Sequence, residues 1–168
     1  MKKIGIILTV IAAMAVPANA QKVGFINTDS VMMALPDYQN AIKQLDAQAS
    51  QYKQELDNSL KIVEQMYNSY QSQKNYLSTS QRTNIENEII AQEQQVKNRQ
   101  ESYFGKDGTM AKASEQLLKP IRDKVSAAVA QYAASKGYTV VMDLAITAGI
   151  IYKNDADDMT QAVINILK

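Results

Sequence analysis

A hydrophobic heptad repeat constrains this chain more than any other feature of its sequence. From residue 42 an apolar or small residue recurs at every seventh position, and a companion set follows three residues later. The first set is Ile42, Ala49, Leu56, Val63, Tyr70 and Leu77, and the second is Leu45, Tyr52, Ser59, Met66 and Gln73. Two such positions per heptad form a narrow stripe along one side of a helix. No proline or glycine interrupts residues 42–77, so a helix of roughly 50 Å is predicted.

A helix of this length with so thin an apolar stripe needs a partner helix. Leu77–Gln81 is a cluster of mostly small polar residues that suits a turn. After it, the apolar spacing resumes at Ile85, Ile89, Val96 and Tyr103. The simplest interpretation is an antiparallel helical hairpin with its tip near residues 77–81, because short connections favour antiparallel neighbours. The alternative is one continuous rod that dimerises through its heptads.

The first twenty residues have the pattern of a cleavable signal peptide. Lys2 and Lys3 precede an apolar run over residues 4–16, and Ala18-Asn19-Ala20 provides the small residues of a signal-peptidase site. The run is about thirteen residues long, whereas a membrane span needs roughly twenty. No cysteine follows that could carry a lipid anchor. We therefore expect an exported protein that begins at residue 21 and is not stably inserted in a membrane.

Composition argues against nucleic-acid binding and against enzymatic chemistry. The chain has 18 Lys and Arg against 17 Asp and Glu, and Lys2 and Lys3 leave with the signal peptide, so the exported part is nearly neutral. It contains no cysteine and no histidine. The usual general base, the thiolate nucleophile and the commonest metal ligands are therefore missing. We expect no enzymatic activity, no metal site and no cofactor.

The ends of the chain have strand-like patterns. Residues 22–27, 138–143 and 149–152 are rich in β-branched and aromatic residues, with residues 144–148 connecting the last two. Two glycines in Gly105–Gly108 predict a break in the returning helix. The acidic run at residues 154–158 lacks the glycine and glutamate of a calcium loop, so an Asp N-cap for a final helix is the simpler interpretation.

These short strands cannot bury a core by themselves. Small sheets with open edges are only marginally stable without partners. We therefore expect the two end segments of the chain to assemble with those of other copies. The predicted fold is mainly α with a small β part. The arms of the hairpin comprise residues 37–109, and an oligomerisation body is built from residues 21–36 and 110–168. The candidate oligomerisation residues are Val23, Phe25, Val141 and Ile151.

Five short motifs, in order along the chain, resemble the Skp/OmpH family of periplasmic chaperones. They are Leu35-Pro36-Asp37-Tyr38, Lys119-Pro120-Ile121, Lys136-Gly137-Tyr138, Tyr152 and Asp157-Asp158-Met159-Thr160. The resemblance covers essentially the whole exported chain. It implies a homotrimer in which three hairpins surround a cavity that holds unfolded outer-membrane proteins without ATP. It also implies a location in the periplasm.

The outer part of the first arm, residues 60–77, carries more apolar residues than the two heptad positions of the stripe require. Flexible methionine and amphipathic tyrosine suit weak contacts with many unfolded chains. The candidate client-binding residues are Met66, Tyr67, Tyr70 and Tyr76, although hairpin packing explains any one of them equally well. A second hypothesis is a structural coiled-coil protein of the envelope, or an adaptor that binds one folded partner.

Overall fold

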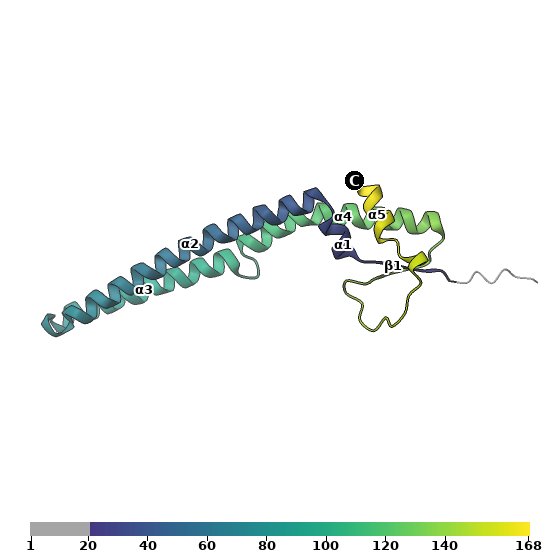
Figure 1. The fold of residues 1–168 in the computed structure, drawn as a ribbon. Coiled ribbons are helices and arrows are strands. Elements are labelled where there is room, and N and C mark those ends of the chain that lie inside the picture. The colour runs from purple at the N-terminus through teal and green to yellow at the C-terminus, as the bar shows by residue number, and fades with distance from the viewer. Residues whose placement is uncertain (1–20) are drawn as a thin grey trace, which may run out of the picture.

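The structure, a computed structural model, describes residues 21–168; the predicted signal peptide lies outside these residues. The elements in chain order are β1 (Val23–Ile26), α1 (Thr28–Met33), α2 (Pro36–Gln73), α3 (Thr79–Phe104), α4 (Thr109–Lys136), β2 (Val140–Asp143) and α5 (Thr160–Leu167). Two short 3₁₀ turns cover Lys74–Tyr76 and Asp155–Asp157. Helices therefore dominate, and strands occur only near the two ends of the described chain (Figure 1).

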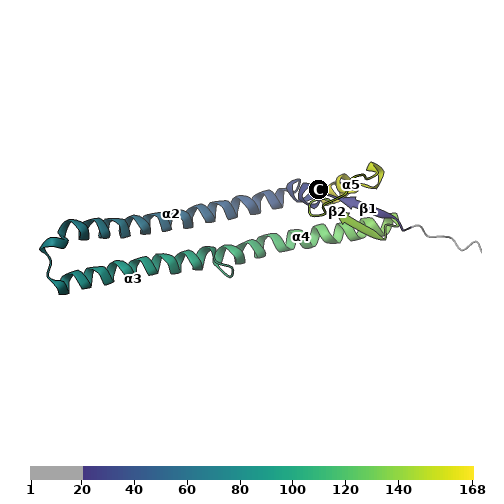
Figure 2. The same cartoon turned by 90° about the horizontal axis from the view of Figure 1, so that it is seen from below.

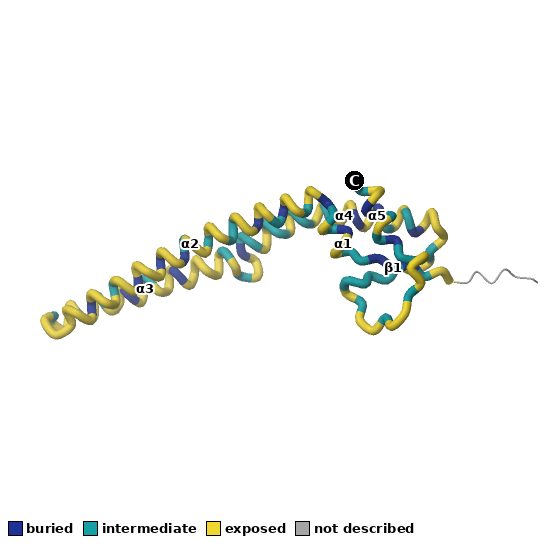
Figure 3. The backbone as a smooth tube through the Cα atoms, viewed as in Figure 1, coloured by how far each residue is buried: buried dark blue, intermediate teal, exposed yellow. Residues whose placement is uncertain are grey.

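The antiparallel helical hairpin is confirmed. α2 leads away from the strands, and α3 and α4 return beside it (Figures 1 and 2). The buried residues follow the predicted heptads and appear as dark blue segments that recur along α2 and α3 (Figure 3). Leu56, Val63 and Tyr70 of α2 pack with Ile89 and Val96 of α3. We call α2, α3 and the turn between them the arm, and these buried positions its seam.

The chain turns a few residues earlier than the sequence suggested. α2 ends at Gln73, a 3₁₀ turn follows, and α3 already begins at Thr79. Ser78 caps α3, because its hydroxyl accepts a hydrogen bond from the Gln81 backbone N–H while the Gln81 side chain accepts from the Ser78 N–H. The small polar residues predict the turn itself, whereas this capping box makes them the start of the returning helix.

The predicted break at Gly105–Gly108 is confirmed, since α3 ends at Phe104 and α4 begins at Thr109. The interruption is visible as a small loop beside the hairpin (Figure 1). If residues 105–108 are left out of the count, Ile121 and Ala128 follow Tyr103 by two and three whole heptads. The four residues therefore form an insert that leaves the returning helices in the same heptad phase.

We expect that deleting residues 105–108 will join α3 and α4 into one helix. The seam keeps its phase, and the joined helix contains neither of the two glycines, each of which would cost about 1 kcal/mol inside it. Circular dichroism should show unchanged or greater helicity and an equal or higher melting temperature. Deleting only residues 105–106 is the control, because it changes the phase and should lower the melting temperature. Equal melting behaviour of the two deletions would contradict the register argument.

The strands and short helices form a separate core, which we call the body: β1, α1, the second half of α4, β2 and α5. β1 pairs with β2 in parallel, from Val23 opposite Val140 to Ile26 opposite Asp143. The hairpin serves as the long crossover that parallel strands require. The core side chains of the body are Ile26, Val31, Leu35, Val125, Ala128, Ala133, Met159, Val163 and Ile164. This cluster is distinct from the arm seam, so body and arm each bury apolar surface of their own.

Two expectations for the C-terminal segment are corrected. Residues 149–152 are irregular and not a strand. The far edge of β1 is occupied near Phe25, where the backbone N–H of Met159 donates to the Phe25 carbonyl at 2.8 Å. α5 is not capped by an aspartate in the N-cap position, which Met159 occupies. Asp158 instead accepts from the Thr160 backbone N–H at 2.9 Å, one residue before that position.

Candidate functional site

The arm is the first candidate site, because its seam determines which side chains are left for other molecules. Polar contacts extend across the seam at intervals. The Tyr70 hydroxyl donates to Glu86, the Tyr103 hydroxyl donates to Glu55 at 2.7 Å, and the Arg99 guanidinium donates to the Ser59 hydroxyl at 3.1 Å. These contacts fix the alignment of α2 against α3.

The tyrosines of the seam are held as hydrogen-bond donors. The hydrogen bond to Glu86 raises the pKa of Tyr70, and the hydrogen bond to Glu55 raises the pKa of Tyr103, with burial adding to both. Tyr103 also stacks on Tyr52 with the ring centroids 4.0 Å apart. The phenols therefore stay protonated at neutral pH and serve the pairing of the helices.

The structure divides the four candidate client-binding residues. Tyr67 and Tyr76 have 51% and 90% of their surface exposed and are available to another molecule. Tyr70 is 5% exposed and belongs to the seam, contrary to the idea of an outward-facing side chain. Met66 is partly buried against the same cluster. The correction at Tyr70 follows from the heptad, since Tyr70 lies seven residues after the buried Val63.

Four more large apolar residues of the arm are exposed, namely Leu60, Ile62, Ile90 and Phe104. Leu60 and Ile62 are among the extra apolar residues that the sequence shows in the outer arm, whereas the sequence analysis does not identify Ile90. The pair Ile89-Ile90 contained the signal, because adjacent helical residues point about 100° apart and only one can enter the seam. Ile89 is buried and Ile90 is 60% exposed.

The sheet of the body has an apolar face that is only partly covered. The register and the alternation of strand side chains place Val23 and Phe25 on the same face as Val140 and Met142. Val140 is 50% exposed. In the nearby loop, Ile151 is fully exposed, which is unusual for a large apolar side chain.

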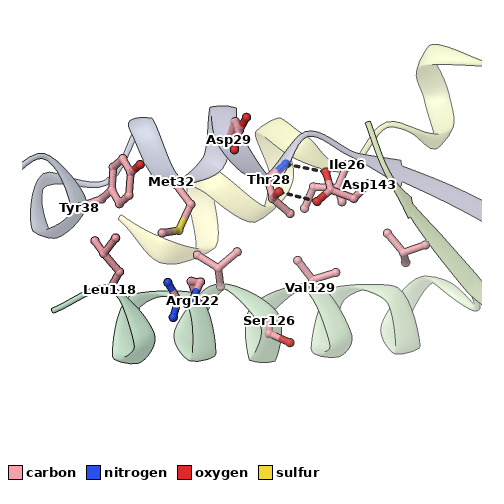
Figure 4. A pocket seen from close by; sticks show the side chains of 12 residues that line it. Ile26, Thr28, Asp29, Met32, Tyr38, Leu118, Arg122, Ser126, Val129 and Asp143 are labelled. Carbon is pink, nitrogen blue, oxygen red and sulfur yellow. Dashed lines mark hydrogen bonds between the residues drawn. The ribbon is translucent and has the colours of Figure 1, made fainter. Parts of the chain in front are cut away.

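Val141, the remaining oligomerisation candidate, lies on the opposite face of the sheet and lines a cavity of about 470 Å³ (Figure 4). The cavity lies between the sheet, α1 and α4, with Met32, Leu118 and Val129 among its apolar walls. At its polar end, Asp143 accepts from the Thr28 backbone N–H at 3.1 Å and from the Thr28 hydroxyl at 2.5 Å. These two bonds tie β2 to the start of α1.

We expect Asp143→Asn to destabilise the body by about 1–3 kcal/mol at neutral pH, because an amide cannot accept on both atoms. Partial burial opposes ionisation of Asp143, but hydrogen bonds from the Thr28 side chain and from the Ala145 and Thr28 N–H groups hold its pKa below the usual range. A lowered carboxyl pKa contributes stability above the unfolded value, about 3.9, that is lost as pH falls through the folded value.

Urea unfolding at pH 7 and at pH 3 measures this contribution. The difference in unfolding free energy between the wild type and Asp143→Asn should be larger at pH 7 than at pH 3. Gln161→Asn, at an exposed position of α5, is the control and should change the unfolding free energy little at either pH. A difference that does not depend on pH would contradict the role given to the ionised carboxylate.

In residues 21–168, no group of three or more Asp or Glu side chains is arranged to hold a metal ion. Over the same residues, no helix combines the length and the apolar character needed to cross a membrane. The exposed apolar side chains of the arm and the partly covered apolar face of the body sheet are the candidate interaction surfaces.

The fold is a long helical hairpin attached to a small body that contains two strands. This architecture places the protein in a class of long-armed helical proteins. The OmpH-like outer membrane protein family matches residues 22–167. The chain therefore belongs to the OmpH/Skp family of outer membrane chaperones.

Individual relatives agree with this assignment. The chaperone protein Skp of Pectobacterium atrosepticum is 26% identical over 161 residues, which cover 95% of this chain and 93% of the relative. The crystal structure of an OmpH-like protein from Caulobacter crescentus CB15 superposes with a TM-score of 0.68 at 12% identity. That match covers 88% of this chain and 83% of the other, and it supports the fold.

Proposed function

We propose that the protein is an ATP-independent holdase that binds unfolded outer-membrane proteins in the periplasm and prevents their aggregation. The observation that carries the proposal is the set of exposed apolar side chains on the outer arm, at Leu60, Tyr67, Tyr76 and Ile90. They belong to an element that has its own buried seam and projects away from the body (Figure 1). The fold of the single chain does not require them to be apolar.

Exposed apolar side chains on a long arm suit a client that has no fixed structure. Burying apolar surface contributes roughly 25 cal/mol per Å², whichever sequence supplies that surface. Each contact is weak, but the contacts that follow the first on the same client are intramolecular and gain from a high effective concentration. Several arms around one client would therefore hold it firmly without a deep pocket or an energy source.

Several arms require several copies of the chain, and we infer a homotrimer assembled through the body. The open face of the sheet around Val23 and Phe25, together with the exposed Ile151, supports this assembly. Val141 lies on the opposite face of the sheet, packed against the core of the same chain, and is not part of this surface. The arms would then surround a common cavity that receives the client.

Aggregation of unfolded β-barrel proteins on dilution from urea, measured by light scattering, tests the holdase. The wild-type protein should suppress aggregation of several barrel proteins of unrelated sequence without ATP. Tyr67→Ser combined with Tyr76→Ser should weaken binding about tenfold, because two amphipathic rings are lost from the contact surface. Both residues are exposed, so helicity should stay at the wild-type value.

The matched control is Ile42→Ser combined with Leu45→Ser at the base of the arm, where Leu45 is buried. This double variant should lower the melting temperature, in contrast to the outer pair. Wild-type protein that fails to suppress aggregation of any barrel client would overturn the proposed function. Strong binding of one folded envelope protein in place of unfolded clients would favour the adaptor hypothesis.

A further inference from the structure

The two sides of the arm differ in chemistry. The contacts between Glu55 and Tyr103 and between Ser59 and Arg99 align the two helices, and the heptad then assigns each exposed residue to one side of the seam. One side carries almost only amides and hydroxyls, which include Gln51, Asn58, Gln65, Ser69, Gln95 and Asn98. The opposite side carries most of the flanking charges, including Lys53, Glu64, Lys74, Glu86, Glu93 and Lys97, together with the exposed apolar residues Leu60, Tyr67 and Ile90. We call the first the amide side.

A shallow groove of about 330 Å³ lies on the amide side in the outer half of the arm. Ile62 and Met66 of α2 and Ile85 of α3 give it apolar surface, and Gln65 and Ser69 supply polar groups beside them. Ile62 is 49% exposed, so part of this apolar surface is accessible. The groove therefore combines apolar contact area with groups that both donate and accept hydrogen bonds.

Few carboxylates interrupt the amide side. Glu55 accepts hydrogen bonds from the Tyr103 hydroxyl at 2.7 Å and from the Gln51 amide at 3.2 Å, so its charge is directed to groups of the arm itself. Glu88 lies at the margin of the groove. A strongly charged partner of either sign would gain little binding free energy from this surface, because the surface offers few opposite charges to attract it.

We propose that the amide side of the arm binds the backbone of an extended, unfolded polypeptide; this rests on the proposed holdase function and adds a second contact surface to the exposed apolar residues of the opposite side. An unfolded segment presents N–H and C=O groups that need partners when water is displaced, and amide side chains satisfy both kinds. Strand segments of outer-membrane barrels alternate apolar and polar side chains. An extended segment of this kind can therefore place apolar side chains in the groove while its backbone contacts the glutamines.

Isosteric substitutions test the proposal. The probe is an outer-membrane barrel protein that is unfolded in urea and then diluted into buffer. Gln65→Glu combined with Gln95→Glu places two charges on the amide side. Covering them with a neutral backbone carries a desolvation cost, so the dissociation constant should rise about tenfold. Gln54→Glu combined with Gln94→Glu adds the same charge on the outer backs of the two helices, and should leave the dissociation constant within about twofold of wild type.

A second pair separates loss of the amides from gain of charge. Gln65→Ala combined with Gln95→Ala removes the hydrogen-bonding groups without adding charge, and should weaken binding about threefold to tenfold at both low and high salt. Circular dichroism and sedimentation verify that helicity and oligomeric mass are unchanged in all variants. If the wild type holds the client but the amide-side and back-face pairs bind it equally well, this proposal is overturned while the holdase function stands.

A second copy is the competing occupant of the amide side. If the arm of a neighbouring copy covered this surface, the amide-side pair would change the oligomeric mass or the thermal transition of the arm in the absence of client. That result would overturn the polypeptide site in favour of an arm–arm contact. A wild type that holds no client would instead remove the proposed function on which the site rests.

Discussion

Replacing Ile151 by aspartate is expected to convert the assembled protein into monomers without unfolding the single chain. Ile151 is fully exposed in one chain, so a charge there costs a monomer almost nothing. In an assembly that covers this residue with apolar surface, the charge would be buried without a partner, which costs several kcal/mol. Light scattering coupled to size exclusion should show the mass falling from three chains to one at micromolar concentration.

Phe25→Asp should give the same change of mass, with an additional loss of stability because Phe25 is partly buried in the sheet. Gln161→Asp introduces the same charge at an exposed position of α5 and is the control that should leave the mass unchanged. A wild-type chain that is a stable monomer under these conditions, or an Ile151→Asp protein with the wild-type mass, would contradict assembly through this surface.

Shortening the arm is expected to abolish client holding while the body stays folded and assembled. A deletion that respects the seam removes residues 49–69, three heptads of α2, together with residues 88–112. The second segment contains three heptads of the return path and the four-residue insert, so both junctions remain in phase. The core of the body, from Ile26 to Ile164, loses no residue.

Calorimetry and aggregation assays measure the two parts of this expectation. The shortened protein should keep a cooperative thermal transition and the mass of the wild-type assembly. Unfolded barrel proteins should aggregate in its presence at nearly the rate seen without any chaperone, because most of the exposed apolar residues of the arm are gone. Loss of the thermal transition of the body would show that arm and body do not fold independently.

The parts of the structure that follow from local pattern could be predicted from the sequence. The seam from Leu56 to Val96 and the helix break at Gly105 depend on heptad spacing and on glycine, which the sequence displays directly. The tip was misplaced because serine and threonine suit both a turn and a helix start. Only the reciprocal bonds between Ser78 and Gln81 decide between these two roles.

The parts that depend on strand pairing were harder to predict. Residues 149–152 have strand composition, but in the single chain they pair with neither β1 nor β2, and composition alone does not make a strand. Val141 was grouped with Val23 and Phe25 because all three are apolar. The observed register, with Val23 opposite Val140, places Val141 on the other face of the sheet, and a shift of one residue would reverse this assignment.

Among the candidate client-binding residues, the heptad sets already include Tyr70 and Met66 and leave out Tyr67 and Tyr76. Tyr70 and Tyr67 have the same side chain three residues apart, yet one is 5% and the other 51% exposed. The heptad from Leu56 through Val63 assigns Tyr70 to the seam once the pairing of α2 with α3 is known. The same pairing of α2 with α3 determines which of the remaining arm residues are exposed together on each side of the seam.

Sedimentation velocity of the protein mixed with an unfolded outer-membrane barrel protein, without ATP, tests whether the trimer holds an unfolded client. We expect one boundary with the mass of three chains and one client, in which circular dichroism shows no barrel structure in the client until detergent micelles are added. A client that aggregates and leaves the protein to sediment alone would contradict it, as would a complex formed only with a folded partner.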